Sequence, residues 1–308
     1  MIKSEIICRP ITASDEKEII LARNEIFKKN DDWNFFRYFY SSPDKKNLNG
    51  LVLTTKNNDL VGAVFFVLLK CFYLNKEIPL YLICDEFIKL AWQKHGYGVF
   101  LNKEIYNFVS KNSVGFGLAS HKYTGPGRLF KVNAYLKKIG LSSRIFPYKN
   151  KFGNAKIESL SSFNDLSDDI FLKLKGPAAS IKIIKDKKYL DWRYLNLPDN
   201  PYQAYTIKIN SKIISYFILE SKNKTAYIAD LAYSNSDDLE KLINITTHWC
   251  QKTGYRQVAF ILINEFIEKK LIALGYQLQP TDQWLVWMTA TNDLSKKSDW
   301  HIIYGDLL

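Results

Sequence analysis

The pattern of apolar and polar positions runs through the same order of elements twice along the chain. In each half, helix-like segments precede a hairpin of two strand-like runs, a third apolar strand, an amphipathic helix, a short buried strand and a closing helix. We expect the closing helix to end at Ile139-Gly140-Leu141 in the first half and at Leu274-Gly275-Tyr276 in the second. Because hairpins are mixed with helical crossovers, the pattern predicts an α/β (α+β) fold, in which each half is a mixed, mostly antiparallel sheet flanked by helices.

Short motifs recur in the same order in the two halves, which favours a duplicated domain over chance resemblance. Phe36-Arg37-Tyr38 returns as Trp192-Arg193-Tyr194 at the end of a helix-like segment, and Ile83-Cys84-Asp85 returns as Ile228-Ala229-Asp230 in the third strand. Apolar content falls between residues 150 and 165, where Gly, Asn and Ser collect. We therefore predict two tandem domains, 1–150 and 151–308.

Composition excludes several classes of protein. With 308 residues and 47% hydrophobic content, the chain can build a substantial core. The longest apolar run is ten residues, half of the ~20 that cross a bilayer, and no secretory signal precedes it, so we expect a cytoplasmic protein without a membrane span. The four cysteines lack CxxC spacing and the four histidines are scattered, so neither a disulfide framework nor a metal site is expected.

The net charge of +12 allows an anionic partner, but most of the excess is single, scattered lysines. Solvated surface charge is therefore the favoured interpretation, and nucleic-acid binding is the less favoured one.

The chemical signal lies in the segment AWQKHGYG, residues 91 to 98, which joins a buried strand to a helix. The first turn of a helix leaves backbone N–H groups unpaired, and glycine lets an anion approach them closely, so a diphosphate fits there. The spacing is neither that of a nucleoside-triphosphate loop nor the GxGxxG of a dinucleotide fold. A second glycine pair, Gly115 and Gly117, lies inside a short strand, where close packing explains it.

The segment Gln93-Lys94-His95-Gly96-Tyr97-Gly98 resembles the Q/R-x-x-G-x-G/A signature of the GNAT acetyltransferase superfamily. Ile88, five residues upstream, stands where that motif carries the apolar end of its strand. The order of elements resembles a GNAT domain over residues 3–148, and residues 165–290 resemble a second, degenerate copy. The resemblance therefore implies a tandem GNAT chain.

This resemblance implies acetyl-CoA or another acyl-CoA as the acyl donor. The diphosphate would bind the turn formed by Gln93, Lys94, His95, Gly96, Tyr97 and Gly98. The pantetheine arm would run like an added strand beside Phe87 and Ile88, and a backbone N–H near Ile88 would polarise the thioester carbonyl.

The second copy departs from the pattern at the matching turn. The segment LAYSNSDDLEKL contains no glycine, and Asp237 and Asp238 stand where a phosphate would bind. Asp237 and Glu240 have the spacing of a capping box, which closes the helix start internally. We therefore expect one CoA site per chain.

An amine must lose a proton to attack a thioester, and the thiolate benefits from gaining one. Strand alternation places Asp85 with Phe87, and Glu86 with Cys84 and Ile88, so both carboxylates are candidate bases. The recurrence of Asp85 as Asp230 also fits structural ion pairs with Arg37 and Arg193.

The acid is harder to assign. The family places a tyrosine four residues before the glycine of its last helix; here that residue is Leu136, which leaves Tyr135 as the candidate and Tyr123 as a substitute. Near the C-terminus, Trp300 and Tyr304 would stack on a sugar ring or cover a sheet edge.

Three functions remain open. The leading one is transfer of an acyl group from acyl-CoA to a small-molecule amine by direct attack, with an amino sugar as one candidate acceptor. A Fem-like aminoacyl transferase would use charged tRNA and give the basic surface a role. A degenerate tandem domain would only bind a partner.

Overall fold

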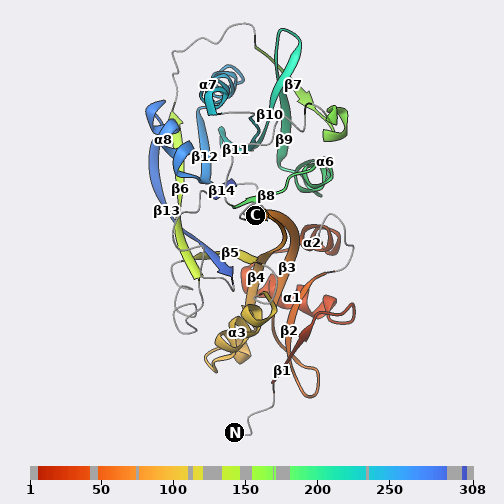
Figure 1. The fold of residues 1–308 in the computed structure, drawn as a ribbon. Coiled ribbons are helices and arrows are strands. Elements are labelled where there is room, and N and C mark those ends of the chain that lie inside the picture. The colour runs from red at the N-terminus through yellow and green to blue at the C-terminus, as the bar shows by residue number, and fades with distance from the viewer. Residues whose placement is uncertain are drawn as a thin grey trace. The chain divides into compact units, whose positions relative to one another are not determined.

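The computed structural model describes residues 6–41, 48–73, 76–109, 114–120, 134–145, 155–168, 170, 181–233, 236–289 and 300–303. The chain divides into two compact units, and each is a mixed sheet with helices on its faces (Figure 1). This arrangement confirms the predicted fold class. Within the described ranges, no helix is long and apolar enough to cross a membrane, and no three metal-binding side chains gather.

The first half supplies the elements of the first unit in the predicted order. They are β1 (Ile6–Pro10), α1 (Glu16–Phe27), α2 (Trp33–Tyr40), β2 (Gly50–Thr55), β3 (Leu60–Tyr73), β4 (Lys76–Ile88), a 3-10 turn (Leu90–Trp92), α3 (Tyr97–Val109) and β5 (Val114–Ser120). The strand order is β1-β2-β3-β4-β5-β13, where β13 spans Gln277–Thr289. The β4–β5 pair is parallel, as a crossover through α3 requires.

Helices cover both faces of the first sheet. On one face, Val64 and Phe66 of β3 share a buried cluster with Leu101 and Ile105 of α3. On the other face, the ring of Phe65 lies 4.7 Å, between centroids, from that of Tyr40 on α2. Successive residues of a strand point to opposite faces, so α3 covers one side and α2 the other.

The second unit repeats this plan with the strand order β6-β12-β11-β10-β9-β7. Its elements are β6 (Ala134–Ile145), β7 (Lys156–Leu160), a 3-10 turn (Phe163–Asp165), β8 (Ile181–Ile183), α6 (Lys187–Leu190), a π-helical turn (Asp191–Leu195), β9 (Tyr202–Ile209), β10 (Lys212–Lys222), β11 (Thr225–Leu231), α7 (Ser236–Lys252), β12 (Gln257–Ile263), α8 (Glu265–Ala273) and β14 (Trp300–Ile303). Helix α7 packs on this sheet through a core that includes Leu239, Leu242 and Ile243.

The prediction of a helix ending at Ile139-Gly140-Leu141 is wrong, because these residues lie in strand β6. Leu136 and Ile139 have helical spacing, but the Gly-Leu-Ser-Ser run that follows suits a helix poorly. Its partner, β12, lies more than 100 residues away in the sequence, and that long-range pairing decides the conformation. In the second half, α8 does precede Leu274-Gly275 as predicted, and Gly275 adopts a φ of +85°.

Each unit is completed by a strand from the other half of the chain. In the first unit, Gln283–Thr289 of β13 pair antiparallel with β5. In the second, Gly140–Ile145 of β6 pair antiparallel with β12. The predicted division at residue 150 therefore differs from the compact units, which exchange these two segments.

Candidate functional site

The pairing of β4 with β5 stops before either strand ends. The last paired residues are Ile83 and Gly117, while β5 continues beside β13 and β4 continues to Ile88. Gly117 permits this close pairing, since a Cβ there would lie 2.9 Å from the Ile83 carbonyl oxygen. Beyond this point the edge of β4 that faced β5 has no strand partner among the described residues. An extended ligand with amide groups can pair with such an edge.

A bulge in β4 lies at the same place. Ile83 and Ile88 both pack against the cluster under α3, although five residues of regular strand would put them on opposite faces. Asp85 has a φ of +41°, which is unusual for a residue other than glycine. The bulge therefore puts Cys84 and Asp85 together on the face away from α3, whereas the prediction had placed Cys84 with Glu86.

The glycine turn is tied to the end of β4. The Gln93 side chain donates a hydrogen bond of 2.9 Å to the carbonyl oxygen of Ile88. Lys94 and Gly96 adopt φ values of +67° and +84°. The four residues Gln93 to Gly96 are exposed, and no atom lies within 4 Å of a Cβ placed on Gly96. The turn is therefore open to solvent on the side where a ligand would approach.

Helix α3 begins directly after this turn with unpaired backbone donors. Phe100 N–H donates to Gly96, which closes the first helical bond. In the described part of the chain, the N–H groups of Tyr97, Gly98 and Val99 have no acceptor within hydrogen-bond distance. These donors, the helix dipole and the exposed Lys94 favour a bound anion.

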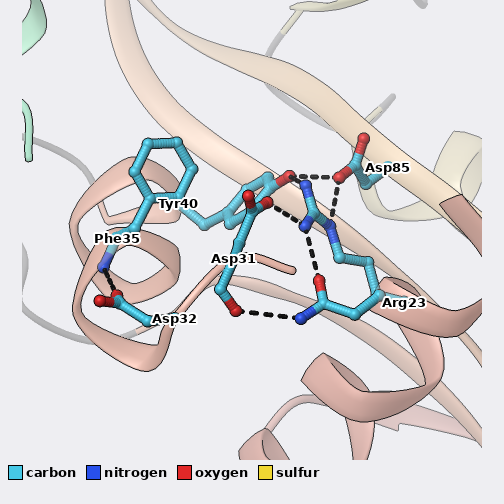
Figure 2. Close-up of polar contacts among 7 residues, drawn as sticks. Arg23, Asp31, Asp32, Phe35, Tyr40 and Asp85 are labelled. Atoms are coloured by element: carbon cyan, nitrogen blue, oxygen red, sulfur yellow. Dashed lines mark hydrogen bonds and ion pairs between the residues drawn. The ribbon is translucent and has the colours of Figure 1, made fainter. Parts of the chain in front are cut away.

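Asp85 is held by side chains from both α1 and α2 (Figure 2). Arg23 Nε donates to Asp85 Oδ2 at 2.7 Å, and the hydroxyl of Tyr40 donates to the same oxygen. Arg23 is 1% exposed, and its remaining donors bind Asp31, the Asn24 amide oxygen and the Tyr40 hydroxyl. Burial and the nearby Asp85 raise the pKa of Tyr40 well above its ordinary value, so its hydroxyl keeps the proton that it donates.

The predicted pairing of Asp85 with Arg37 is wrong, whereas the pairing of Asp230 with Arg193 stays a prediction. Arg37 lies 3.7 Å from Glu16 and stacks over Trp33, while Asp85 pairs with Arg23. In the second unit, Asp230 pairs with Lys185 at 3.1 Å.

Glu86 points to the opposite face, toward α3. The Asn102 amide donates to Glu86 Oε1 at 2.5 Å and to the Gly98 carbonyl oxygen at 2.9 Å. Burial raises the pKa of Glu86 to about 7, and the hydrogen bond from Asn102 opposes this rise. A carboxyl group with such a pKa can give up and take a proton near neutral pH.

Comparison with known proteins supports the fold. No family model matches the chain, and no curated protein matches it in sequence. Its backbone is similar to a GCN5-related N-acetyltransferase from Anabaena variabilis, with a TM-score of 0.67 and 11% identity over 92% of this chain and 72% of that one. A probable N-acyltransferase from Enterococcus faecalis gives a TM-score of 0.67 and 10% identity with the same coverage.

The yeast neighbour extends the likeness to nearly the whole chain. The N-myristoyltransferase of Saccharomyces cerevisiae, crystallised with myristoyl-CoA, gives a TM-score of 0.60 and 14% identity over 98% of this chain and 90% of that one. The chain has the GNAT fold. Two GNAT-like units stand in tandem, as the sequence predicted.

The second GNAT-like unit has no site of this kind among its described residues. Its β11 stops pairing with β12 at Ile228 and Phe260, which matches the end of the β4–β5 pairing. Leu262 and Ile263 then pair with Ile303 and Ile302 of β14. Because Leu262 also pairs with Gly140 of β6, β14 occupies the edge that β11 leaves. The chain's own C-terminal strand thus fills the position that stays open in the first unit.

The structure places most predicted residues of the site together in the first unit. Phe87 and Ile88 end β4, the residues from Gln93 to Gly98 form the turn, and Asp85 and Glu86 flank the bulge on opposite faces. Tyr135 lies on β6, so the helix that pointed to it does not exist, and its side chain is outside the described part. Tyr123, Tyr304 and the side chain of Asp237 are also outside it.

Sequence reasoning missed Arg23, Tyr40 and Asn102. The sequence does contain one indication that Arg23 is buried, because it lies three and four residues after Ile20 and Ile19 on the apolar side of α1. A lone arginine on such a face requires a buried acid.

Proposed function

We propose that the chain is an acyl-CoA-dependent N-acyltransferase, with acetyl-CoA or another acyl-CoA as donor and an amine as acceptor. The observation that carries the proposal is the unpaired end of β4 beside an open helix N-terminus, within one unit of GNAT fold. The fold neighbours are consistent with this chemistry.

Different segments of the proposed site bind different parts of the donor. The N–H groups at the start of α3 and Lys94 bind the diphosphate, while the edge of β4 at Phe87 and Ile88 pairs with the amides of the pantetheine arm. A free backbone N–H of this edge stabilises the negative charge that develops on the thioester oxygen. The amine nitrogen attacks the carbonyl carbon, the C–S bond breaks, and the thiol of CoA leaves.

Glu86 suits the role of proton acceptor better than Asp85. Oδ2 of Asp85 already accepts hydrogen bonds from Arg23 and Tyr40, so these two donors occupy that oxygen. Glu86 has no cationic partner among the described residues, and its pKa of about 7 makes it half ionised at neutral pH. It receives the proton of the amine directly or through one water molecule.

Binding of the donor is the first test. Millimolar acetyl-CoA should raise the melting temperature by several degrees, because a ligand at 100 times its Kd stabilises the folded state by about 2.7 kcal/mol. Pantetheine, which lacks the diphosphate, serves as the control and should give little shift. Release of free thiol on adding amines then reports transfer. A melting temperature that millimolar acetyl-CoA leaves unchanged would contradict the proposal.

The number of bound donors is the second test. Since β14 fills the matching position in the second unit, titration calorimetry and native mass spectrometry should give one CoA per chain. Two equivalents, or one equivalent bound after the turn of the first unit is blocked, would show that the second unit also binds CoA.

A further inference from the structure

Only one oxygen of the Asp85 carboxylate is hydrogen-bonded to the described part of the protein. Its Oδ2 accepts from Arg23 and Tyr40, whereas Oδ1 has no partner among the described residues. The side chain is 22% exposed, although Arg23 behind it is almost fully buried. One oxygen is therefore fixed and the other is left for a further donor.

The matching residue of the second unit is the internal comparison. Asp230 is 3% exposed, and both of its oxygens have partners: Oδ1 accepts from Leu231 N–H and Oδ2 from Lys185. That unit also has its strand gap filled by β14. Asp230 is thus buried with both oxygens paired in the unit where β14 fills the position beside the strand. Asp85 is partly exposed with one oxygen unpaired in the unit where that position is unfilled among the described residues.

The charges around Asp85 favour a cation. Arg23 is shared by Asp85 and Asp31, so the three groups carry a net charge of −1. A buried ion network of this kind is weak evidence for stability, since the charges lose much of their hydration. It does fix the direction of a carboxylate, and the φ of +41° at Asp85 shows that the chain accepts strain to hold it.

We propose that Asp85 binds the ammonium group of the acceptor through Oδ1, with Arg23 and Tyr40 as positioning residues. This inference rests on the proposed N-acyltransferase function and narrows its acceptor to an aliphatic amine that is protonated at neutral pH. Asp85 lies on the face away from α3, so the acceptor reaches the bulge from the side of α1 and α2. After binding, the ammonium passes one proton through water to Glu86, the neutral amine attacks the carbonyl carbon of the thioester, and the C–S bond breaks to release CoA.

Benzylamine and aniline make a suitable pair of probes, because they differ by one methylene and only benzylamine is charged at neutral pH. With acetyl-CoA as donor, the native protein should have the lower KM for benzylamine. Asp85→Asn should raise that KM about 10- to 100-fold, the range for a lost hydrogen bond between charged groups, and leave the KM for aniline nearly unchanged. Tyr40→Phe should raise the benzylamine KM about 3- to 10-fold, the range for a lost hydrogen bond of ordinary strength.

The control variant is Asp230→Asn, which changes the sealed counterpart and should leave both acceptor KM values unchanged. The shift in melting temperature with acetyl-CoA must persist in every variant, which separates failure of this inference from failure of the proposed function. Should Asp85→Asn not fold, Tyr40→Phe carries the test, because it removes only the hydroxyl, which donates to Asp85 and accepts from Arg23, and keeps the ring. Equal losses for both acceptors, or thiol release with neither amine while acetyl-CoA binds, would overturn the inference.

Discussion

Replacing Gly96 with glutamate is expected to abolish the effect of acetyl-CoA on the melting temperature and to lower kcat/KM for the donor by about 1000-fold or more. A Cβ at this position would meet no atom within 4 Å, so there is room for a side chain to leave the backbone. The φ of +84° costs a non-glycine residue about 1–2 kcal/mol. The larger effect is electrostatic, because the new carboxylate competes for the N–H groups of α3 and repels the diphosphate.

Gly254 provides a matched control for this substitution. It also has a positive φ, +95°, and open space where a side chain would lie, but it follows α7 in the second unit. Gly254→Glu should therefore show the same loss of stability with full response to acetyl-CoA. Gly96→Ala introduces the backbone strain without the charge, so comparing it with Gly96→Glu separates the two effects. If folded Gly96→Glu still shows the full shift in melting temperature with acetyl-CoA, the diphosphate does not bind at this turn.

Glu86→Gln is expected to lower kcat by about 100- to 10,000-fold, the usual range for a lost general base. A base must be ionised to accept a proton, so the native rate should rise as pH increases through about 7, the pKa that burial gives to Glu86. The variant should lose this dependence. Asn102→Ala removes the hydrogen bond that lowers this pKa, and should move the rise in rate to higher pH.

Stability gives a second measurement that does not depend on activity. The folded-state pKa of Glu86 is raised above the unfolded value of 4.5, so the folded protein loses stability as pH rises from about 4.5 to 7. Glu86→Gln removes this loss, and should be more stable than the native protein at pH 8 by at most about 3 kcal/mol, and equally stable near pH 4. A pH–rate profile that survives in Glu86→Gln would assign the proton transfer to another group.

The turn and the duplicated plan were predictable because local signals specify them. Two closely spaced glycines between a buried strand and an amphipathic helix leave few alternatives, and the recurrence of Asp85 as Asp230 fixes the alignment of the halves. The structure adds that each aspartate lies two residues after the point where its strand stops pairing with its parallel neighbour, at Ile83 or Ile228.

The parts that were missed depend on contacts between distant segments. The apolar spacing in β6 fits a helix as well as a strand, and pairing with a distant strand such as β12 decides between them. The bulge at Asp85 breaks the alternation from which the face of Cys84 was inferred. The partners of Asp85 come from 62 and 45 residues upstream, so their identity cannot be read from the neighbourhood of the motif.

The exchange of strands between the halves has a consequence for biosynthesis. The edge of β5 stays uncovered until residues 283 to 289 have been translated, and the first unit therefore cannot mature as an autonomous N-terminal domain on the ribosome. An uncovered strand edge is a template for wrong pairing between chains. We therefore expect expression of either half alone to yield an incomplete, association-prone product.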